Sequence, residues 1–339
     1  MAIKRIFITG SAGFIGYHLA ELLLDRGLLI AGYDGMTDYY DVNLKHRRHA
    51  ILRQHEGFSA TEALLEDHER LGSALIAFKP DVIVHLAAQA GVRYSIDNPR
   101  AYFDANLIGS FNVMEWARTL GVAHLLMAST SSVYGANTEM PFTETQRVCT
   151  PLTFYAATKL ATEGMGHSYA NIYRLPITMF RFFTVYGPWG RPDMALFKFT
   201  KGIIESTPID IYNNGEMYRD FTYVTDLVRG IAGLIDAVPS APGHAGEFLD
   251  SDSLSPVAPF RIVNIGNSEK IRLIDFIDAI EEEIGRKAIR NYMPMQQGDV
   301  PATWADASLL QSLTGHRPKT QYRSGVAKFV AWYRDFYNV

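Results

Sequence analysis

The sequence predicts an α/β protein built on a doubly wound parallel sheet, with a smaller mixed lobe after it. Short apolar, β-branched runs alternate with longer amphipathic segments, which is the pattern of parallel strands joined by right-handed helical crossovers. From about Tyr186 this rhythm breaks into loops rich in Pro and Gly, which predicts the second lobe. The expected strands are Arg5 to Thr9, Leu29 to Asp34, Asp81 to Ala87, His124 to Thr130 and Ile177 to Phe183.

Length and charge limit the classes of function that fit the chain. With 339 residues and 47% hydrophobic content, the protein can bury a sizeable core. The net charge of -4 disfavours nucleic acid and anionic membrane as partners. The one basic run, Lys45 to Arg48, has helical spacing, and a solvated helix face is its favoured interpretation.

Cysteine content points to a reducing compartment. Cys149 is the single cysteine, so the chain can form neither an intrachain disulfide nor a zinc cluster. No metal is therefore expected, and the cytoplasm is the expected location. No apolar stretch of the sequence is long enough to cross a bilayer.

A glycine-rich turn, residues 9–16, follows the first expected strand directly and runs into a helical pattern. Glycine allows a tight turn, close approach to a pyrophosphate and close helix–strand packing, while free amides and the helix dipole bind the anion. An ordinary strand-to-helix turn is the alternative. Asp34 decides against it, because this acid ends the second strand where a ribose-binding carboxylate should lie.

The turn and Asp34 together predict a Rossmann-type site for NAD. A carboxylate at that position repels the 2′-phosphate of NADP, so NAD is favoured over NADP. The cofactor contacts expected from these segments are Gly10, Gly13, Phe14, Ile15, Gly16 and Asp34. Residues 1–183 are then the expected NAD-binding domain, to which segments near 221–238 and 261–266 return, and residues 184–339 form most of the substrate-binding lobe.

Tyr155 and Lys159 open a helix after the expected strand His124 to Thr130, with Thr153 available as its cap. Their spacing places both side chains on one helix face, one turn apart. Because the pKa of a free tyrosine is about 10, a general base near neutrality needs an adjacent cation and a positive nicotinamide ring. Such a pair occurs in many helices, but its place in a dinucleotide-binding unit favours a catalytic interpretation.

These features resemble the extended short-chain dehydrogenases, the NAD-dependent epimerase/dehydratase group. The glycine spacing carries the resemblance, and so does the segment His85-Leu86-Ala87-Ala88-Gln89-Ala90. It implies that Ala87, Ala88 and Gln89 line the pyrophosphate and nicotinamide side. It also implies that Thr130 binds the reacting sugar hydroxyl and completes a catalytic set with Tyr155 and Lys159, which contact NAD as well. Leu64-Leu65 stand where the family commonly has an acid and an aliphatic residue near the adenine, so that contact stays open.

Two positions after Thr130 distinguish the reactions of this group. Related dehydratases carry Asp-Glu there and UDP-glucuronate decarboxylases carry Glu at the second position, whereas this chain has Ser131 and Ser132. The acid needed for elimination is therefore absent. The segments Gln89 to Ser95 and Arg181 to Ala195 look like UDP-glucuronate 4-epimerases, and the similarity extends over nearly the whole chain. It implies transient oxidation at carbon 4 by bound NAD, rotation of the 4-keto sugar and hydride return, which interconverts UDP-glucuronate and UDP-galacturonate.

The same resemblance implies a set of substrate contacts. Epimerases of neutral UDP-sugars usually have Asn where Thr184 stands, and a hydroxyl there suits a carboxylate at carbon 6, together with Ser131 and Ser132. The other implied contacts are Arg219 to the diphosphate, Asp299 to the uridine ribose, Tyr212 to the uracil, Arg191 to the phosphates or the substrate mouth, and Arg93 from the Gln89 to Ser95 segment. Considered alone, the charged residues are ordinary ion-pair partners.

A homodimer is also implied, in which helices at about Tyr102 to Arg118 and Phe154 to Tyr173 pack against their copies. Three other functions stay open. Thr184 disfavours a 4-epimerase of neutral UDP-hexoses, and the two serines disfavour a decarboxylase or dehydratase. The catalytic set of Thr130, Tyr155 and Lys159 disfavours a non-catalytic NAD-binding protein.

Overall fold

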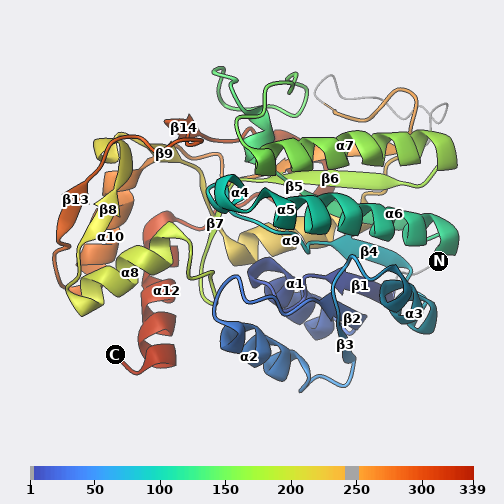
Figure 1. Ribbon diagram of the computed structural model, residues 1–339, viewed down its shortest axis with the longest axis horizontal. Helices are drawn as coiled ribbons and strands as arrows, with labels where there is room; N and C mark the ends of the chain where they lie inside the picture. The colour runs from blue at the N-terminus through green and yellow to red at the C-terminus, as the bar shows by residue number, and fades with distance from the viewer. Residues whose placement is uncertain (1–3, 241–251) are drawn as a thin grey trace.

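A seven-stranded parallel sheet lies at the centre of the computed structural model, which describes residues 4–240 and 252–339 (Figure 1). Its strand order is β3-β2-β1-β4-β5-β6-β11. The bounds are β1 (Arg5–Thr9), β2 (Leu29–Asp34), β3 (Phe58–Glu62), β4 (Val82–His85), β5 (His124–Thr130), β6 (Ile177–Phe182) and β11 (Phe260–Ile265). The predicted doubly wound sheet is confirmed. Because the order reverses between β1 and β4, a crevice opens at the carboxyl ends of these strands.

Helices cover both faces of the sheet because side chains alternate along each strand. Ile6 and Ile8 belong to one apolar cluster with α1 (Phe14–Asp25) and α9 (Val224–Asp236). Phe7 points to the opposite face and belongs to the cluster that the remaining large helices complete. These helices are α3 (His68–Phe78), α6 (Gly109–Leu120) and α7 (Phe154–Tyr173).

Shorter helices connect these layers. α2 (Val42–Leu52) lies against α1 and follows the loop after β2. Between β4 and α6, the chain forms α4 (Tyr94–Asp97), α5 (Pro99–Tyr102) and the π-helical turn η1 (Phe103–Ile108). A 3-10 turn, η2 (Ser131–Tyr134), follows β5 directly.

The second lobe is built on three small sheets. β7 (Thr184–Tyr186) pairs with β10 (Phe221–Tyr223), β8 (Ile209–Ile211) pairs with β13 (Arg290–Tyr292), and β9 (Tyr218–Arg219) lies between β12 (Ile271–Arg272) and β14 (Ala302–Thr303). The helices of this lobe are α8 (Ala195–Glu205), α10 (Leu273–Ile284) and α12 (Tyr322–Tyr337), whereas α11 (Ser308–Thr314) packs against α9 and β11 on the main sheet. Aromatic packing forms the core of this lobe, where the rings of Phe221 and Phe276 stack with centroids 3.8 Å apart.

Strand positions agree closely with the sequence, although β3 was missed and β11 was expected only as a returning segment near 261–266. β1, β2 and β5 have the predicted bounds, while β4 and β6 are shorter than predicted. β3 reads Phe-Ser-Ala-Thr-Glu, forms one edge of the sheet and has no fully buried residue. An edge strand of this kind lacks the apolar run that identified the others.

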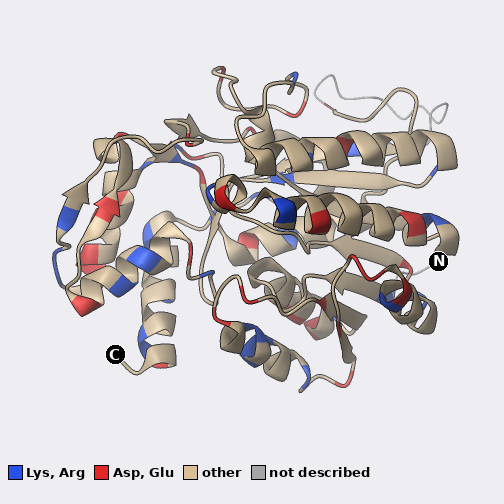
Figure 2. Cartoon of the chain, in the orientation of Figure 1, with Lys and Arg blue, Asp and Glu red and all other residues tan. Residues whose placement is uncertain are grey.

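Charge is spread over the chain rather than gathered into one basic surface. Figure 2 shows positively and negatively charged residues interspersed along the ribbon of both lobes. In the part of the chain that the structure describes, no helix has the length and hydrophobicity needed to cross a membrane.

Candidate active site

A cavity of about 920 Å³ lies at the carboxyl edge of the sheet and extends into the second lobe. It brings together most of the residues expected from the sequence. Its lining includes Gly10, Gly13, Phe14, Ile15, Gly16, Asp34, Ala87, Ala88, Gln89, Thr130, Ser131, Ser132, Tyr155, Lys159, Thr184, Arg191, Arg219 and Asp299. Arg93 and Tyr212 are the two expected contacts that do not line it.

The glycine turn has the geometry that close approach to a dinucleotide requires. Gly10 has a φ of +74°, and a Cβ there would lie 2.7 Å from the backbone nitrogen of Ala87. A Cβ on Gly16 would lie 2.0 Å from the carbonyl oxygen of Gly10, so helix α1 packs directly on the turn. Gly13 precedes α1 and gives it no side-chain cap. The first amides of the helix therefore remain available to an anion, and the site fits the pyrophosphate of NAD.

Asp34 is fixed at the end of β2 by two backbone amides. The Ala12 amide donates to one carboxylate oxygen (3.0 Å), and the Met36 amide donates to the other (2.9 Å). Each oxygen keeps a lone pair that can accept a ribose hydroxyl. This arrangement fits the adenosine ribose of NAD.

Helix α7 carries the candidate base and its cation. Thr153 caps the helix, as expected, by accepting a hydrogen bond from the Ala156 amide (3.2 Å). Lys159 Nζ donates to the carbonyl oxygen of Ala128 in β5 (3.0 Å), which anchors the ammonium beneath the cavity. Tyr155 precedes it by one turn and lines the cavity.

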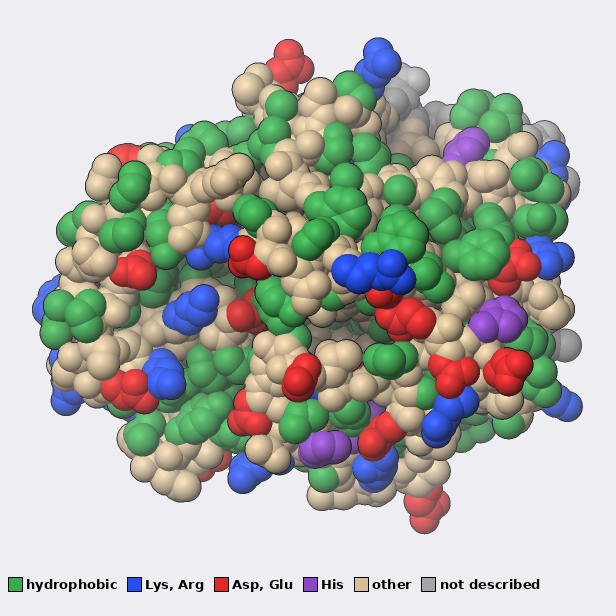
Figure 3. Space-filling view, in the orientation of Figure 1, with side chains coloured by type: hydrophobic (Ala, Val, Ile, Leu, Met, Phe, Trp, Pro, Cys, Tyr) green, Lys and Arg blue, Asp and Glu red, His purple; other side chains and the backbone are tan. Residues whose placement is uncertain are grey.

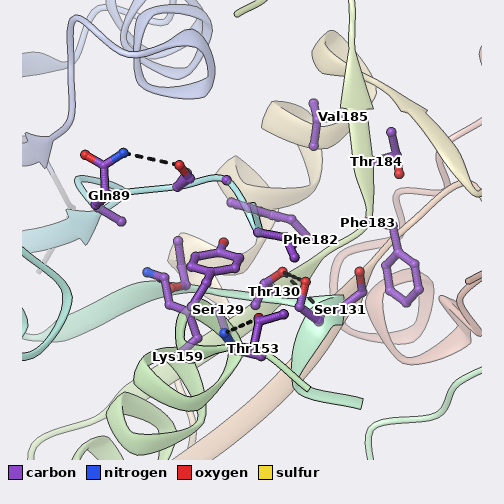
Figure 4. Close-up of a pocket in the computed structure, with 18 of the residues that line it drawn as sticks. Gln89, Ser129, Thr130, Ser131, Thr153, Lys159, Phe182, Phe183, Thr184 and Val185 are labelled. Carbon is purple, nitrogen blue, oxygen red and sulfur yellow. Dashed lines mark hydrogen bonds between the residues drawn. The ribbon is translucent and has the colours of Figure 1, made fainter. Parts of the chain in front are cut away.

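Hydroxyl groups surround this pair at the end of β5. Thr130 Oγ1 donates to Ser132 Oγ and accepts from the Ser132 amide, both at 3.2 Å. Figure 4 shows Thr130 and Ser131 beside each other, with Lys159 on one side and Phe183 and Thr184 on the other. The hydroxyls of β5, η2 and β7 thus face a common space.

The pKa values of the pair follow from burial. Burial raises the pKa of Tyr155 above its ordinary value, and a hydrogen bond with Thr130 partly offsets the rise. Burial lowers the pKa of Lys159 to about 8, although the negative charge of Glu163 raises it. Tyr155 therefore needs nearby positive charge to act as a base at neutral pH, and the positive charge of Arg191 lowers its pKa.

A buried ion pair between Glu163 and Arg181 lies next to Lys159. Glu163 lies one turn after Lys159 on α7 and accepts two bonds from Arg181 of β6, at 2.9 and 2.8 Å. Ser129 of β5 donates to the same carboxylate (2.6 Å). Sequence reasoning missed Glu163, although its spacing of four residues from Lys159 places it on the same helix face.

The substrate side of the cavity carries two arginines. Arg219 Nη1 donates to the carbonyl oxygens of Tyr218 (2.9 Å) and Pro301 (3.3 Å), and burial lowers its pKa. Arg191 forms a bidentate ion pair with Asp193, in which Nε lies 2.9 Å from Oδ1. Both cations reach a space large enough for a nucleotide diphosphate.

Arg93 and Tyr212 lie behind Asp299 at the edge of this region. Arg93 Nη2 donates to Asp299 Oδ2 (3.0 Å), and its guanidinium lies over the Tyr212 ring at 4.5 Å. In this arrangement, the carboxylate of Asp299 lines the cavity while the other two support it.

The basic run on α2 was wrongly interpreted as a solvated face. His46 and Arg47 are exposed, but Lys45 and Arg48 are buried. Lys45 lines the cavity and donates to the carbonyl oxygen of Thr37 (2.6 Å), while Arg48 donates to the carbonyl oxygen of Ala12 in the glycine turn (2.7 Å). The three-residue spacing of the two buried residues was the available signal, since it places them on one side of the helix.

Other lining residues also escaped the sequence. The segment after Asp34 contributes Thr37, Tyr39 and Tyr40, which have no motif of their own. Leu64 and Leu65 line the same cavity, so the departure from the family pattern lies at the cofactor site.

Comparison with known proteins gives one consistent group of relatives. The family model described as "NAD dependent epimerase/dehydratase family" matches residues 6–245. A probable UDP-glucuronate 4-epimerase of Rhizobium meliloti is 54% identical over 333 residues, which cover 98% of each chain. UDP-glucuronate 4-epimerase 1 of Arabidopsis thaliana is 40% identical and is matched over 98% of this chain and 77% of its own length.

Solved structures give the same result. The crystal structure of UDP-glucuronic acid 4-epimerase from Bacillus cereus in complex with UDP-glucuronic acid and NAD matches with a TM-score of 0.87 and 29% identity. The match covers 98% of this chain and 100% of the other. A UDP-glucose 4-epimerase from Thermotoga maritima with UDP-glucose matches with a TM-score of 0.83 and 26% identity, over 98% and 99% of the two chains.

Proposed function

This chain belongs to the NAD dependent epimerase/dehydratase family, and we propose that it interconverts UDP-glucuronate and UDP-galacturonate by transient oxidation at carbon 4. One observation carries the proposal. The cavity joins the set Thr130, Tyr155 and Lys159 to three further hydroxyls and to no acid at the positions after Thr130. The hydroxyls are those of Ser131, Ser132 and Thr184.

Tyr155 is the proposed general base. Its phenolate takes the proton of the carbon 4 hydroxyl, while Thr130 holds the same hydroxyl by a hydrogen bond and Lys159 stabilises the phenolate. Bound NAD supplies a reversible hydride acceptor, so oxidation and reduction cancel over one cycle. The 4-keto sugar rotates within the cavity so that hydride returns to the opposite face of carbon 4, and Tyr155 gives the proton back to the oxygen.

Arg219 and Asp299 are proposed to hold the nucleotide while the sugar turns. Their positions on β9 and on the segment before β14 suit a diphosphate and a ribose, since a guanidinium pairs with phosphate oxygens and a carboxylate accepts ribose hydroxyls. Residues 4–183, with the returning segments near 221–238 and 261–266, are proposed to hold the cofactor, and most of the remainder holds the substrate.

The hydroxyls of Ser131, Ser132 and Thr184, called the hydroxyl ring, have a proposed second role, which is protection of the 4-keto intermediate. Oxidation at carbon 4 makes a β-keto acid, which loses carbon dioxide when its carboxylate is poorly solvated and perpendicular to the ketone. Hydrogen bonds from Ser131, Ser132 and Thr184 would keep the carboxylate solvated and in place. The ring therefore favours epimerisation over decarboxylation.

We also propose a cytoplasmic homodimer. Figure 3 shows hydrophobic side chains gathered over the region that α5, α6 and α7 occupy in Figure 1. Phe103 and Phe111 are 42% and 44% exposed, and Ile172 is 63% exposed, which is a large apolar area for a free surface. Sedimentation of the purified protein tests the dimer, and a monomer at micromolar concentration would contradict it.

Incubation of the purified protein with UDP-glucuronate, followed by NMR without added reductant, tests the function. A mixture of UDP-glucuronate and UDP-galacturonate is expected. Release of carbon dioxide with a UDP-pentose would make the protein a decarboxylase. No change in UDP-glucuronate, with turnover of UDP-glucose, would make it an epimerase of neutral sugars.

A further inference from the structure

The loop after β7 brings an anion-binding group into the cavity from the substrate side. This segment, residues 187–194, is called the arginine loop because it carries Arg191, which lines the cavity beside Thr184. Trp189 in the same loop has a φ of +61°, a left-handed conformation that is strained for a large side chain. The loop therefore needs external contacts to hold its shape.

Those contacts come from the cofactor side of the molecule. His18 of α1 donates to the carbonyl oxygen of Pro188 (2.9 Å), and Tyr39 donates to the Asp193 carboxylate (3.2 Å). Arg48 of α2 donates to the carbonyl oxygen of Trp189 (2.6 Å). This bond restrains the strained residue itself.

Arg48 also holds the glycine turn. The same guanidinium donates to the carbonyl oxygen of Ala12 (2.7 Å) and to the hydroxyl of Tyr40 (2.8 Å). The side chain has no solvent exposure, and all three acceptors are uncharged. Burying a guanidinium is costly unless its donors are satisfied. The three bonds use Nη1 and Nη2, while Nε is buried without a partner among the described residues, so the bonds of Nη1 and Nη2 hold this side chain in place. Arg48 thus forms a rigid brace between the cofactor turn and the arginine loop.

We propose that Arg48 is a positioning residue that couples the cofactor-binding glycine turn to Arg191. The proposal rests on the proposed function, in which Arg191 contacts the anionic part of a UDP-sugar. A glycine turn ordered around NAD fixes the Ala12 carbonyl, which fixes the guanidinium and hence the backbone of Trp189. Arg191, two residues later, is then held where it meets the substrate.

A double-mutant cycle on the NAD-loaded enzyme tests the coupling. The four proteins are wild type, Arg48→Met, Arg191→Ala and the double variant, and the measured quantities are KM and kcat for UDP-glucuronate. Arg48→Met is expected to raise KM about tenfold, with a smaller change in kcat, because a fixed bond network is lost. In the Arg191→Ala background, the same substitution should change KM less than about twofold, since the residue through which it acts is gone.

Equal effects of Arg48→Met in both backgrounds would overturn the proposal, because a purely structural role acts independently of Arg191. Arg53→Met is the matched control. It removes a guanidinium at the end of the same helix, where Arg53 is exposed and pairs only with Glu62, and should leave KM unchanged.

Tyr40→Phe repeats the cycle if Arg48→Met does not fold. This variant removes the hydroxyl that accepts a hydrogen bond from Arg48 Nη1 (2.8 Å), and a KM about threefold above wild type is expected, again only when Arg191 is present. Equal factors in both backgrounds would again refute the coupling. Failure of the proposed function is a separate outcome: wild type would then form no UDP-galacturonate, and the cycle would be measured by dissociation constants for UDP-glucuronate.

Discussion

Two opposing effects act on the pKa of the Lys159 side chain. Burial lowers the pKa to about 8, and Glu163 opposes this change. Glu163 forms its ion pair with Arg181 and accepts a hydrogen bond from Ser129, so it raises the pKa of Lys159 without forming a direct ion pair with it. The charged form of Lys159 therefore depends on a carboxylate one turn away.

Glu163→Gln should move the alkaline limb of the kcat–pH profile to lower pH. Without the carboxylate, the pKa of Lys159 falls further, so the ammonium that supports Tyr155 is lost earlier as pH rises. The variant also breaks the buried pair with Arg181, which costs about 3–5 kcal/mol of folding free energy. Measurement of kcat as a function of pH, at a temperature below unfolding of the variant, checks the prediction. Glu115→Gln, which removes a surface partner of Arg118, is the control, and an unmoved limb in Glu163→Gln would refute the assignment.

Thr184→Val should increase leakage of the intermediate to decarboxylated product. Valine keeps the volume of threonine but removes the hydroxyl proposed to bind the sugar carboxylate. The fraction of turnovers that yields UDP-pentose should rise about tenfold, the typical effect of one hydrogen bond to a charged group. NMR of the products measures this fraction. Thr184→Ser keeps the hydroxyl and should stay near wild type, and equal fractions in the two variants would contradict the protective role.

At the scale of elements, the contact between α1 and the glycine turn leaves no room for a side chain. Gly16→Ala should abolish NAD retention, because its Cβ would lie 2.0 Å from the carbonyl oxygen of Gly10. Gly164→Ala on α7 meets no atom within 4 Å and should instead stabilise the protein by about 0.5–1 kcal/mol. The absorbance of bound cofactor and thermal unfolding measure the two effects. Normal NAD content in Gly16→Ala would show that the turn can move.

Element patterns explain what the sequence could and could not predict. The central strands were located because each is a buried apolar run. The proposed catalytic groups could be predicted to line one cavity because they follow such strands or open the next helix. β3 was missed because an edge strand is only half covered. Lys45 and Arg48 were misjudged because hydropathy along α2 gives no information about the loops that cover it. Tertiary contact, rather than local pattern, places these residues in the site.

At the scale of the whole molecule, buried histidines make stability depend on pH. Burial lowers the pKa of four histidines to about 3 or 4, while the unfolded value stays near 6.5. The four are His18, His49, His85 and His124. Below pH 6.5, the unfolded chain takes up protons that the folded protein cannot bind, so stability is present above pH 6.5 and is lost as pH falls toward 4.

Two buried carboxyls act in the opposite sense. Burial raises the pKa of Glu144 to about 7 and of Asp220 to about 6, so each favours the folded state at low pH and loses that contribution as pH rises. On unfolding near pH 5.5, the four histidines take up protons and the two carboxyls release them. The net result is an uptake of about two protons. The free energy of unfolding should fall by about 2–3 kcal/mol per pH unit between pH 6 and 5. Denaturant titrations at several pH values measure this slope, and a flat profile would contradict it.

His124→Gln isolates one histidine far from the cavity. Nδ1 of His124 donates to the carbonyl oxygen of Ile235 (3.1 Å), and Nε2 lies 2.9 Å from the hydroxyl of Thr178. A glutamine amide can donate and accept similarly but does not titrate. The slope of the free energy of unfolding against pH, between pH 6 and 5, should therefore decrease by about 1.4 kcal/mol per pH unit. Exposed His46→Gln is the matched control, and equal slopes in the two variants would refute the assignment to His124.

The late position of β11 in the chain governs how the protein can fold during synthesis. β11 pairs with β6, and α9 covers α1, yet both segments are translated after the whole N-terminal half. A nascent chain that ends near residue 183 therefore presents the open edge of β6 and an uncovered apolar face of α1. The cofactor-binding half cannot complete its fold as it leaves the ribosome. Its fold can be completed only after residue 265 has been translated, so we expect a gene truncated near residue 183 to yield an aggregating fragment rather than an independent NAD-binding protein.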